Sequence, residues 1–151
     1  MEIPPDVFFL GQLANYWQIL AVKAACELSL ADYFNDGPKS ADEVASAAGL
    51  NACFVSRLLR ALSDCGVFQQ TAPRVFAHTE RSQLLRSDLP QSFKWMVLSE
   101  FGAERVPAWM SLAESIRSGA IAFDHAYGGK DLQFERIIPT RSMSSLILAR
   151  A

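Results

Sequence analysis

Apolar residues recur at mostly helical spacings through the N-terminal part of the chain, from Val7 to Phe34. This pattern predicts one or two long helices. The apolar positions are not confined to one stripe, and a helix that is hydrophobic nearly all round must be buried on several sides. A chain this small has few ways to do that alone, so the pattern predicts a partner chain. The apolar positions are Phe8, Leu10, Leu13, Trp17, Leu20, Ala21, Ala24, Leu28 and Leu30.

Two shorter helices follow, and capping residues mark the first of them. Ser40 and Glu43 have the spacing of a capping box, in which the serine oxygen and the glutamate carboxylate satisfy each other's backbone amides. They predict a helix over 41–48, and Gly49 suits a left-handed cap at its end. A second helix with one apolar face is predicted over 52–65.

The next segment changes from a helical to an alternating pattern. Residues 67–70 and 74–77 flank the turn sequence of residues 71–73, which predicts a short two-stranded wing. Thr79 then begins one more turn of helix that continues through Leu85. Three helices followed by a two-stranded wing are typical of a winged helix.

Two amphipathic helices are predicted after the wing, over 91–101 and 104–117. The end of the chain differs, because residues 134–138 and 145–148 are short apolar runs typical of strands. They predict a C-terminal β-hairpin in a chain that is otherwise mainly α-helical.

Composition bounds the class of protein. The chain has 151 residues, of which 50% are hydrophobic, so we expect one ordinary domain with a real core. The formal charge of −2 disfavours a protein built mainly to neutralise phosphates. Polar residues interrupt the apolar stretch over 7–30, so we predict no membrane span and a cytoplasmic protein. Cys26, Cys53 and Cys65 contain no CxxC pair, and we expect each to be a reduced, buried thiol.

Motifs for catalysis are lacking in the sequence. The eight glycines form neither GxGxxG nor GxxxxGK, so there is no recognisable nucleotide cradle. His78 and His125 have no metal-ligand spacing, and a surface or hydrogen-bonding role suits both better. No local motif indicates a Ser-His-Asp or Cys-His set.

The wing pattern suggests nucleic-acid binding as one possible function. The base-reading residues would then be Arg57 and Arg60 on the helix over 52–65. Phe54 and Val55 stand near the start of that helix, where polar readers would be expected, so we disfavour this interpretation. The cations in a position to contact phosphates are Lys39, Arg74, Arg81 and Arg86.

Several aromatic residues are a possible lining for a small-molecule pocket, although aromatic residues at helical spacing more often form core. An apolar pocket with few polar groups would bind an apolar aromatic molecule. The predicted pocket residues are Trp17, Trp95, Phe101, Trp109, His125 and Tyr127.

The stretch "ANYWQILAVKAACELSLADYFNDGPKSADEVASAAGLNACFVSRLLRALSDCGVFQQ" closely resembles the N-terminal dimerisation domain of S-adenosylmethionine-dependent small-molecule O-methyltransferases. That group includes acetylserotonin, hydroxyneurosporene and antibiotic-tailoring enzymes. The matching elements are the Leu30-Ala31-Asp32 step, the Ser40-Ala41-Asp42-Glu43 cap, the Leu58-Leu59-Arg60-Ala61-Leu62 run and Gly66-Val67-Phe68.

The resemblance implies a mainly α, winged-helix-like dimerisation domain with a small two-stranded wing, and a homodimer formed through its N-terminal helices. In that family the following domain binds S-adenosylmethionine on a glycine-rich loop and supplies a general-base histidine. Neither feature is matched in this sequence. We therefore predict a non-catalytic dimerisation module with no cofactor, metal or catalytic residue of its own.

The tail "LQFERIIPTRSMSSLILARA" resembles the last hairpin of the same family's catalytic domain. The chain thus resembles the first and last parts of one O-methyltransferase joined at residues 129–131, with the methyl-transfer domain between them missing. We predict a helical dimerisation domain over 1–119, a linker and junction over 120–131, and a hairpin remnant over 132–151.

Two other functions stay open at this point. One is a small-molecule binder or repurposed enzyme that uses an apolar cavity between subunits. The other is a winged-helix regulator that binds nucleic acid, whose affinity would fall steeply with salt.

Overall fold

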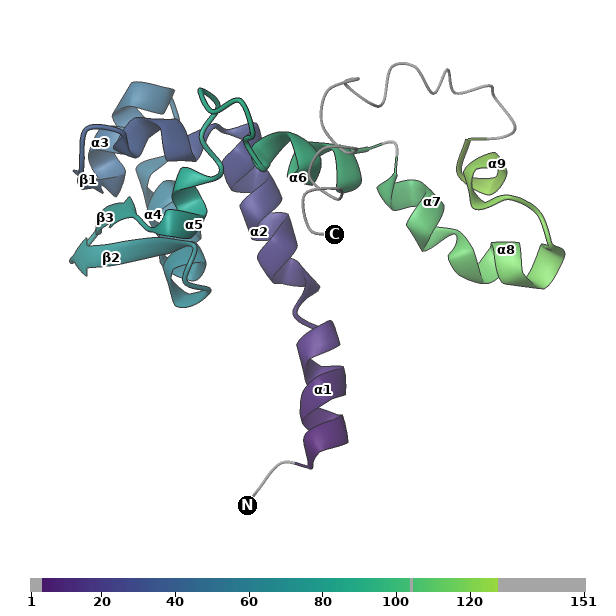
Figure 1. The fold of residues 1–151 in the computed structure, drawn as a ribbon. Helices are drawn as coiled ribbons and strands as arrows, with labels where there is room; N and C mark the ends of the chain where they lie inside the picture. Colours follow the sequence, from purple (N-terminus) through teal and green to yellow (C-terminus); the bar gives the residue numbers. More distant parts are fainter. Residues whose placement is uncertain (1–3, 104, 128–151) are drawn as a thin grey trace, which may run out of the picture. The chain divides into compact units, whose positions relative to one another are not determined.

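The computed structural model describes residues 4–103 and 105–127, which fall into two compact units divided between Lys94 and Trp95 (Figure 1). In chain order, the first unit contains α1 (Pro5–Leu13), α2 (Tyr16–Glu27), the 3-10 helix η1 (Leu30–Phe34), β1 (Lys39–Ser40), α3 (Ala41–Ala48), α4 (Ala52–Asp64), β2 (Phe68–Ala72), β3 (Val75–His78) and α5 (Glu80–Gln83). At and beyond the boundary lie α6 (Lys94–Glu100), α7 (Val106–Met110), α8 (Leu112–Ser118) and α9 (Ala122–Tyr127).

The predicted helical segment over 7–34 is present, but it is divided into three pieces. α1 ends before Asn15, whose backbone ψ of 29° leaves the helical region and starts α2 afresh. α2 ends before Ser29, which adopts a left-handed conformation with φ of 51°. That conformation lets the chain turn from α2 into η1.

Side-chain caps start both central helices. The amide of Glu43 donates to Ser40 Oγ at 3.2 Å, and the amide of Ser40 donates to Glu43 Oε2 at 2.7 Å, which confirms the predicted capping box. Gly49 ends α3 with φ of 67°, also as predicted. Asn51 Oδ1 accepts from two amides in the first turn of α4, at 3.0 and 3.2 Å. A cap of this kind is typically worth about 1 kcal/mol.

The two predicted wing strands pair antiparallel, and a third strand joins them in the order β1-β3-β2. Residues 39–40 are too few to show a strand pattern, so the sequence did not reveal β1. Arg74 makes the turn between β2 and β3 with φ of 62°, and its carbonyl accepts from the Ala41 amide at 2.8 Å. The Arg74 guanidinium also donates twice to the Asp42 carboxylate, at 3.1 and 2.7 Å. These contacts attach the hairpin turn to the start of α3.

The core of the first unit lies where α2, η1, α3 and α4 meet one face of the sheet. Phe34, Phe68 and Phe76 are its largest fully buried side chains, and Leu59 and Leu62 reach it from α4. Smaller side chains complete the core: Ala25, Cys26, Leu30, Ala31, Ala41, Val44, Ala45, Val55 and Leu85.

The helices after the wing are shorter than predicted. α6 begins at Lys94 instead of residue 91, and the helix predicted over 104–117 is divided at Ser111. The Ser111 amide donates to the carbonyls of both Pro107 and Ala108 at 3.1 Å. The Ser111 hydroxyl also donates to the Pro107 carbonyl at 2.9 Å, and this side-chain bond competes with the regular helical hydrogen bonds. α9 forms within the predicted linker and packs against α7 and α8.

The structure confirms a mainly helical fold with a small antiparallel sheet. The predicted hairpin over 132–151 and the predicted junction at 129–131 lie outside the described residues. Among the helices that the structure describes, none has the length and apolarity needed to cross a membrane.

His78 is packed between two core phenylalanines. Its ring stacks on Phe68 with centroids 6.1 Å apart, and it meets Phe34 edge-on at 5.9 Å. Nδ1 lies 2.8 Å from Ser82 Oγ, whereas the buried Nε2 has no hydrogen-bond partner among the described residues. Burial lowers the pKa of this imidazole, and the charge of Arg86 adds to the effect against weaker opposing contributions from the Ala31 backbone and Asp32.

We predict that stability falls as the pH drops through the range in which free histidine titrates. Because the folded-state pKa lies below the ordinary value of about 6.5, the unfolded chain binds this proton first and is favoured by acid. Urea unfolding between about pH 5 and pH 7 measures the effect, since the carboxylates with lowered pKa lose their contribution only at more acidic pH. His78→Gln should flatten this dependence, and an unchanged slope would contradict the assignment.

We also predict that Leu59→Ala lowers the free energy of unfolding by about 2 to 5 kcal/mol, because it leaves a cavity at a side chain that is 0% exposed. Arg60→Ala, on the exposed side of the same helix, should change it by less than about 0.5 kcal/mol. Denaturant unfolding at one fixed protein concentration makes the comparison. Equal losses in the two variants would show that the core is misplaced.

Candidate functional site

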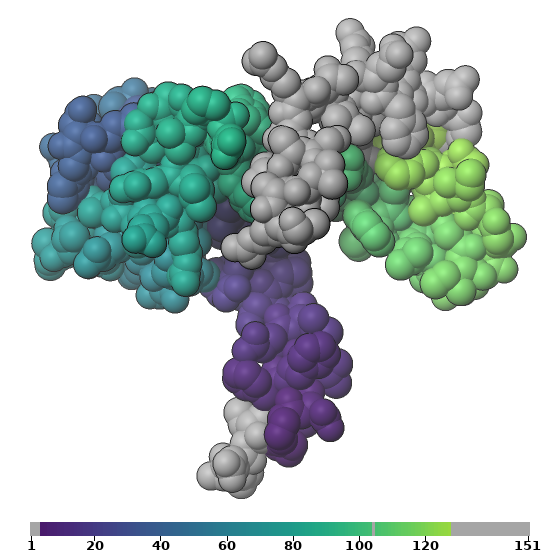
Figure 2. All heavy atoms as spheres, in the orientation of Figure 1, coloured from purple at the N-terminus to yellow at the C-terminus, as the bar shows by residue number. Residues whose placement is uncertain are grey.

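The most unusual surface of the first unit is a continuous set of exposed apolar side chains on α1 and the first half of α2. We call it the N-terminal apolar surface. Its members are between 41% and 68% exposed. They are Val7, Phe8, Phe9, Leu10, Leu13, Tyr16, Trp17 and Leu20. On the face that Figure 2 shows, no other described helix or strand covers α1, in purple.

α1 contributes nothing to the core of its own chain. It has no buried residue, and every residue from Pro4 to Gln18 is exposed. Its apolar side chains point to several sides of the helix, so no single orientation against a flat surface would cover them all. An isolated helix of 9 residues is also marginal in water. The part of the chain that the structure describes therefore does not supply the contacts that α1 requires.

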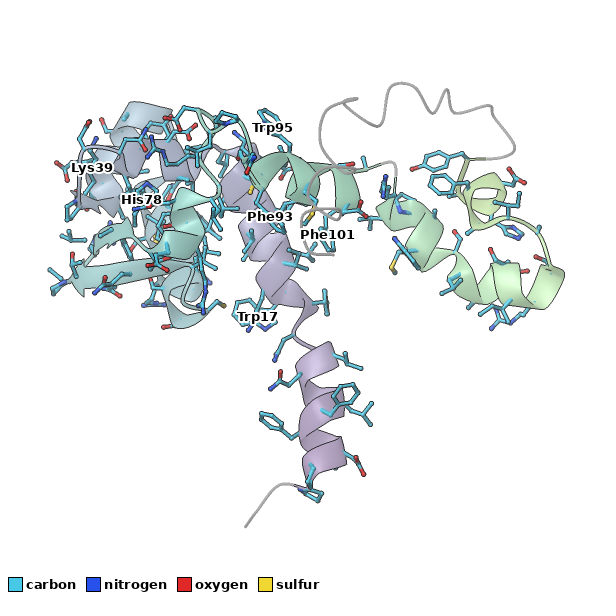
Figure 3. All side chains as sticks on the ribbon, viewed as in Figure 1. Trp17, Lys39, His78, Phe93, Trp95 and Phe101 are labelled. Atoms are coloured by element: carbon cyan, nitrogen blue, oxygen red, sulfur yellow. The ribbon has the colours of Figure 1, made fainter. Side chains whose placement is uncertain are left out.

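α2 connects this surface to the core. Its second half packs inward through Ala25 and Cys26, whereas Trp17 and Leu20 remain exposed on its first half (Figure 3). A buried half and an exposed apolar half on one helix fix the N-terminal apolar surface to a rigid base. That arrangement suits a protein–protein contact.

A second apolar feature lies beside α2. A hollow of about 240 Å³, which we call the apolar hollow, is open to solvent on one side. Leu84 and Phe93 are the exposed residues of its lining, and the Phe93 amide donates to the Leu84 carbonyl at 2.8 Å. Phe93 is labelled in Figure 3. Arg81 is the only charged residue in the lining, and its Nη1 donates to the Gly66 carbonyl at 3.1 Å. The lining residues are Val22, Val67, Arg81, Leu84, Leu85 and Phe93.

The chain segment that carries the edge of the hollow is held firmly. Lys94 follows Phe93 and is only 5% exposed, with Nζ donating to Ser29 Oγ at 2.7 Å and to Ser87 Oγ at 2.6 Å. The Ser87 amide donates in turn to Asp32 Oδ1 at 2.7 Å. These bonds tie the loop between α5 and α6 to the end of α2 and to η1.

The six predicted pocket residues are distributed over both units. Trp17 lies on α2 in the first unit, while Trp95 and Phe101 lie on and just after α6 (Figure 3). Trp109 on α7 is 68% exposed. His125 and Tyr127 both lie on α9. No described contact brings all six together around one cavity.

The two α9 residues make local contacts. His125 Nε2 lies 2.8 Å from Ser118 Oγ, and the same oxygen lies 2.8 Å from the Glu114 carbonyl and 3.2 Å from the Ala120 amide. The Tyr127 hydroxyl donates to the Ala103 carbonyl at 2.7 Å. The contacts of Ser118 are those of a residue that ends a helix, because its hydroxyl bonds to the backbone of its own segment. They connect α8 to α9.

The described residues contain no group of three or more metal-ligating side chains. His78 is partly buried, and its Nδ1 lies 2.8 Å from Ser82 Oγ, so it has the hydrogen-bonding role that the sequence suggested. The predicted phosphate-contacting cations are mostly engaged: Arg74 pairs with Asp42, and Arg86 with Asp88. On α4, Arg57 lies over the Phe54 ring at 5.6 Å.

The prediction for the cysteines is right for one and wrong for another. Cys26 is 2% exposed, and burial raises the pKa of its thiol to about 11. Cys65 is partly buried, and burial raises its pKa as well. Cys53 is exposed, because it lies on the outer side of the first turn of α4.

Sequence reasoning identified α1 and α2 as a partner surface but missed the apolar hollow. Leu84, Leu85 and Phe93 fall in a short helical turn and a loop, where no apolar period exists to mark a surface. The only sequence signal was the adjacent pair of leucines.

Comparisons with known proteins agree with this geometry. A family model for the O-methyltransferase dimerisation domain matches residues 11–88, which lie within the first unit. Phenazine O-methyltransferase PhzM of Lysobacter antibioticus is 31% identical over 126 residues, covering 83% of this chain and 37% of the relative. A 2,7-dihydroxy-5-methyl-1-naphthoate 7-O-methyltransferase of Streptomyces carzinostaticus is 35% identical over 120 residues, covering 79% and 36%.

Solved structures show the same similarity. The crystal structure of LaPhzM superimposes with a TM-score of 0.75 at 31% identity, covering 83% of this chain and 38% of that one. The O-methyltransferase NcsB1 from neocarzinostatin biosynthesis gives a TM-score of 0.64 at 34% identity, covering 79% and 40%. The chain thus spans less than half the length of these relatives. With its helical fold and small sheet, it belongs to the O-methyltransferase dimerisation-domain family.

Proposed function

We propose that this chain is a dimerisation module that pairs with a second copy of itself through the N-terminal apolar surface. The observation that carries the proposal is that every residue of α1 is exposed although most of them are apolar. The match of residues 11–88 to a dimerisation-domain family supports it. A two-fold dimer is the commonest arrangement of identical chains.

The free energy gained by burying these side chains is large enough to support self-association. Full burial of one large apolar side chain stabilises by about 1.5 to 3 kcal/mol, and a two-fold contact covers each such residue twice. Association costs about 4 to 15 kcal/mol in lost freedom of motion. Covering all eight of these residues in both copies, each only about half exposed to begin with, would gain about 12 to 24 kcal/mol, which is comparable to or larger than that cost.

Methyl transfer is not proposed for the 151 residues alone. The matched stretch is 37% of the length of the methyltransferase PhzM, and the described residues contain no GxGxxG or GxxxxGK motif. In a longer protein of the relatives' size, the module would hold two catalytic subunits together. A cytoplasmic location also stays a prediction.

Binding of an apolar aromatic molecule by the six predicted pocket residues is the weaker proposal, because those residues belong to two units. Nucleic-acid binding is weaker still, because three of the six proposed cations, Lys39, Arg74 and Arg86, are paired with carboxylates.

We predict that the chain is a dimer at micromolar concentration by sedimentation equilibrium. Phe9→Asp combined with Leu13→Asp should yield a folded monomer, because carboxylates on the N-terminal apolar surface cannot be buried without a partner. Phe54→Asp is the matched control, since Phe54 on α4 is 65% exposed and Leu13 is also 65% exposed. A well-folded monomer of the unmodified chain at that concentration would sink the proposal.

We further predict that S-adenosylmethionine does not bind the 151-residue chain with micromolar affinity, because no preorganised donor cradle is present in the described residues. Isothermal titration calorimetry measures this directly. Saturable binding at micromolar concentration would reveal a donor site and restore an enzymatic role.

A further inference from the structure

We propose that the C-terminal segment of the chain, residues 134–148, docks onto an exposed apolar surface of α7 and α8 and covers it. We call the acceptor the α7–α8 apolar surface. Its members are Trp109, Met110, Leu112 and Ile116, which are 68%, 81%, 45% and 76% exposed. All four lie in the second unit, so this docking does not depend on self-association through the N-terminal apolar surface.

Three of these side chains form one stripe along the two helices. Trp109, Leu112 and Ile116 are spaced three and four residues apart, which places them on the same side of a helix. The interruption at Ser111 does not scatter them, because the Ser111 amide still donates to the Pro107 carbonyl four residues earlier. The apolar stripe therefore continues from α7 into α8.

Another side of α8 carries serines, and this side faces the neighbouring helix. Ser111 and Ser115 are partly buried, and Ser118 Oγ lies 2.8 Å from His125 Nε2 on α9. A surface helix ordinarily turns its apolar stripe inward and its polar side to water. Within the described residues α8 does the reverse, and none of its residues is buried. Its apolar side is left for another occupant.

The chain's own C-terminal segment has the apolar content and the reach to be that occupant. Residues 134–138 and 145–148 are its two apolar runs. α9 packs against both α7 and α8 and ends at Tyr127, seven positions before Phe134. Seven residues span up to about 25 Å. α8 has 7 residues and is only about 10 Å long, so the first run can reach either end of it.

Tethering favours this occupant over a separate protein. A segment joined to its target by a short linker has an effective concentration of about millimolar, which a partner chain at micromolar concentration does not match. Charge acts in the same direction. Residues 134–151 contain three arginines and one glutamate, whereas Glu114 on α8 and Asp124 on α9 are exposed carboxylates. Such exposed charges add little affinity, but they favour an oppositely charged partner.

Acrylamide quenching of Trp109 tests the inference in the full 151-residue chain. Trp17→Phe and Trp95→Phe leave Trp109 as the single tryptophan. We expect its fluorescence to be quenched much less than that of free tryptophan, because the segment covers it. Ile138→Asp combined with Leu146→Asp should raise the quenching constant about threefold, since carboxylates cannot be buried on an apolar surface. Thr140→Asp combined with Ser142→Asp adds the same charge at polar positions of the segment and should leave the constant unchanged.

Trypsin cleavage gives the reciprocal test from the acceptor side. Arg136 and Arg141 are trypsin sites within and between the two apolar runs. Ile116→Asp should accelerate cleavage after these arginines by about tenfold, because proteolysis follows the population of the undocked segment. Phe54→Asp is the matched control, since Phe54 on α4 is also an exposed apolar residue, and it should not accelerate cleavage. Mass spectrometry of the fragments identifies the sites.

The outcomes separate this proposal from self-association. It is overturned if Trp109 is quenched like free tryptophan, if both double variants of the segment change quenching equally, or if Ile116→Asp and Phe54→Asp accelerate cleavage equally. Shielding of Trp109 that disappears as a dimer dissociates in sedimentation equilibrium would assign the surface to a second copy and also overturn it. A monomer with shielded Trp109 that responds to the segment variants would support the docking and overturn self-association.

Discussion

The constraint on which the rest of this structure depends is the need to cover α1. Its apolar side chains lie on several sides of the helix, and the other described residues bury none of them. Hydrophobic burial is the main favourable term in folding, so a helix in this condition is stable only with added contacts. The chain belongs to a family of dimerisation domains, and under the proposed self-association a second copy would supply such contacts.

The remainder of the first unit provides a base that does not depend on the partner. Three buried phenylalanines and the inner face of α4 form a core, and the capping box and the Asp42–Arg74 pair fix its edges. The exposed ion pair adds little free energy by itself. Its contribution is geometric, because it attaches the hairpin turn to α3. The N-terminal apolar surface is thus presented from a preformed fold.

Local features were predictable from the sequence, and features made by tertiary contact were not. The capping box of Ser40 and Glu43 and the apolar face of α4 follow from spacing alone. β1 exists only through its pairing with β3, so its two residues carry no signal. The apolar hollow combines Val22 with Phe93, residues far apart in sequence, and no local pattern brings such residues together. The interruption between α1 and α2 at Asn15 is a change in the backbone ψ angle, and the sequence pattern does not show it.

Hydrogen exchange of the α1 amides at two protein concentrations tests the central claim most directly. If a second copy covers α1, amides of residues 5–13 should be protected well above the dissociation constant and should exchange at nearly the rate of free peptide far below it. The core amides of α4 should stay protected at both concentrations. Fast exchange of α1 at both concentrations, in a chain whose core is protected, would contradict the account.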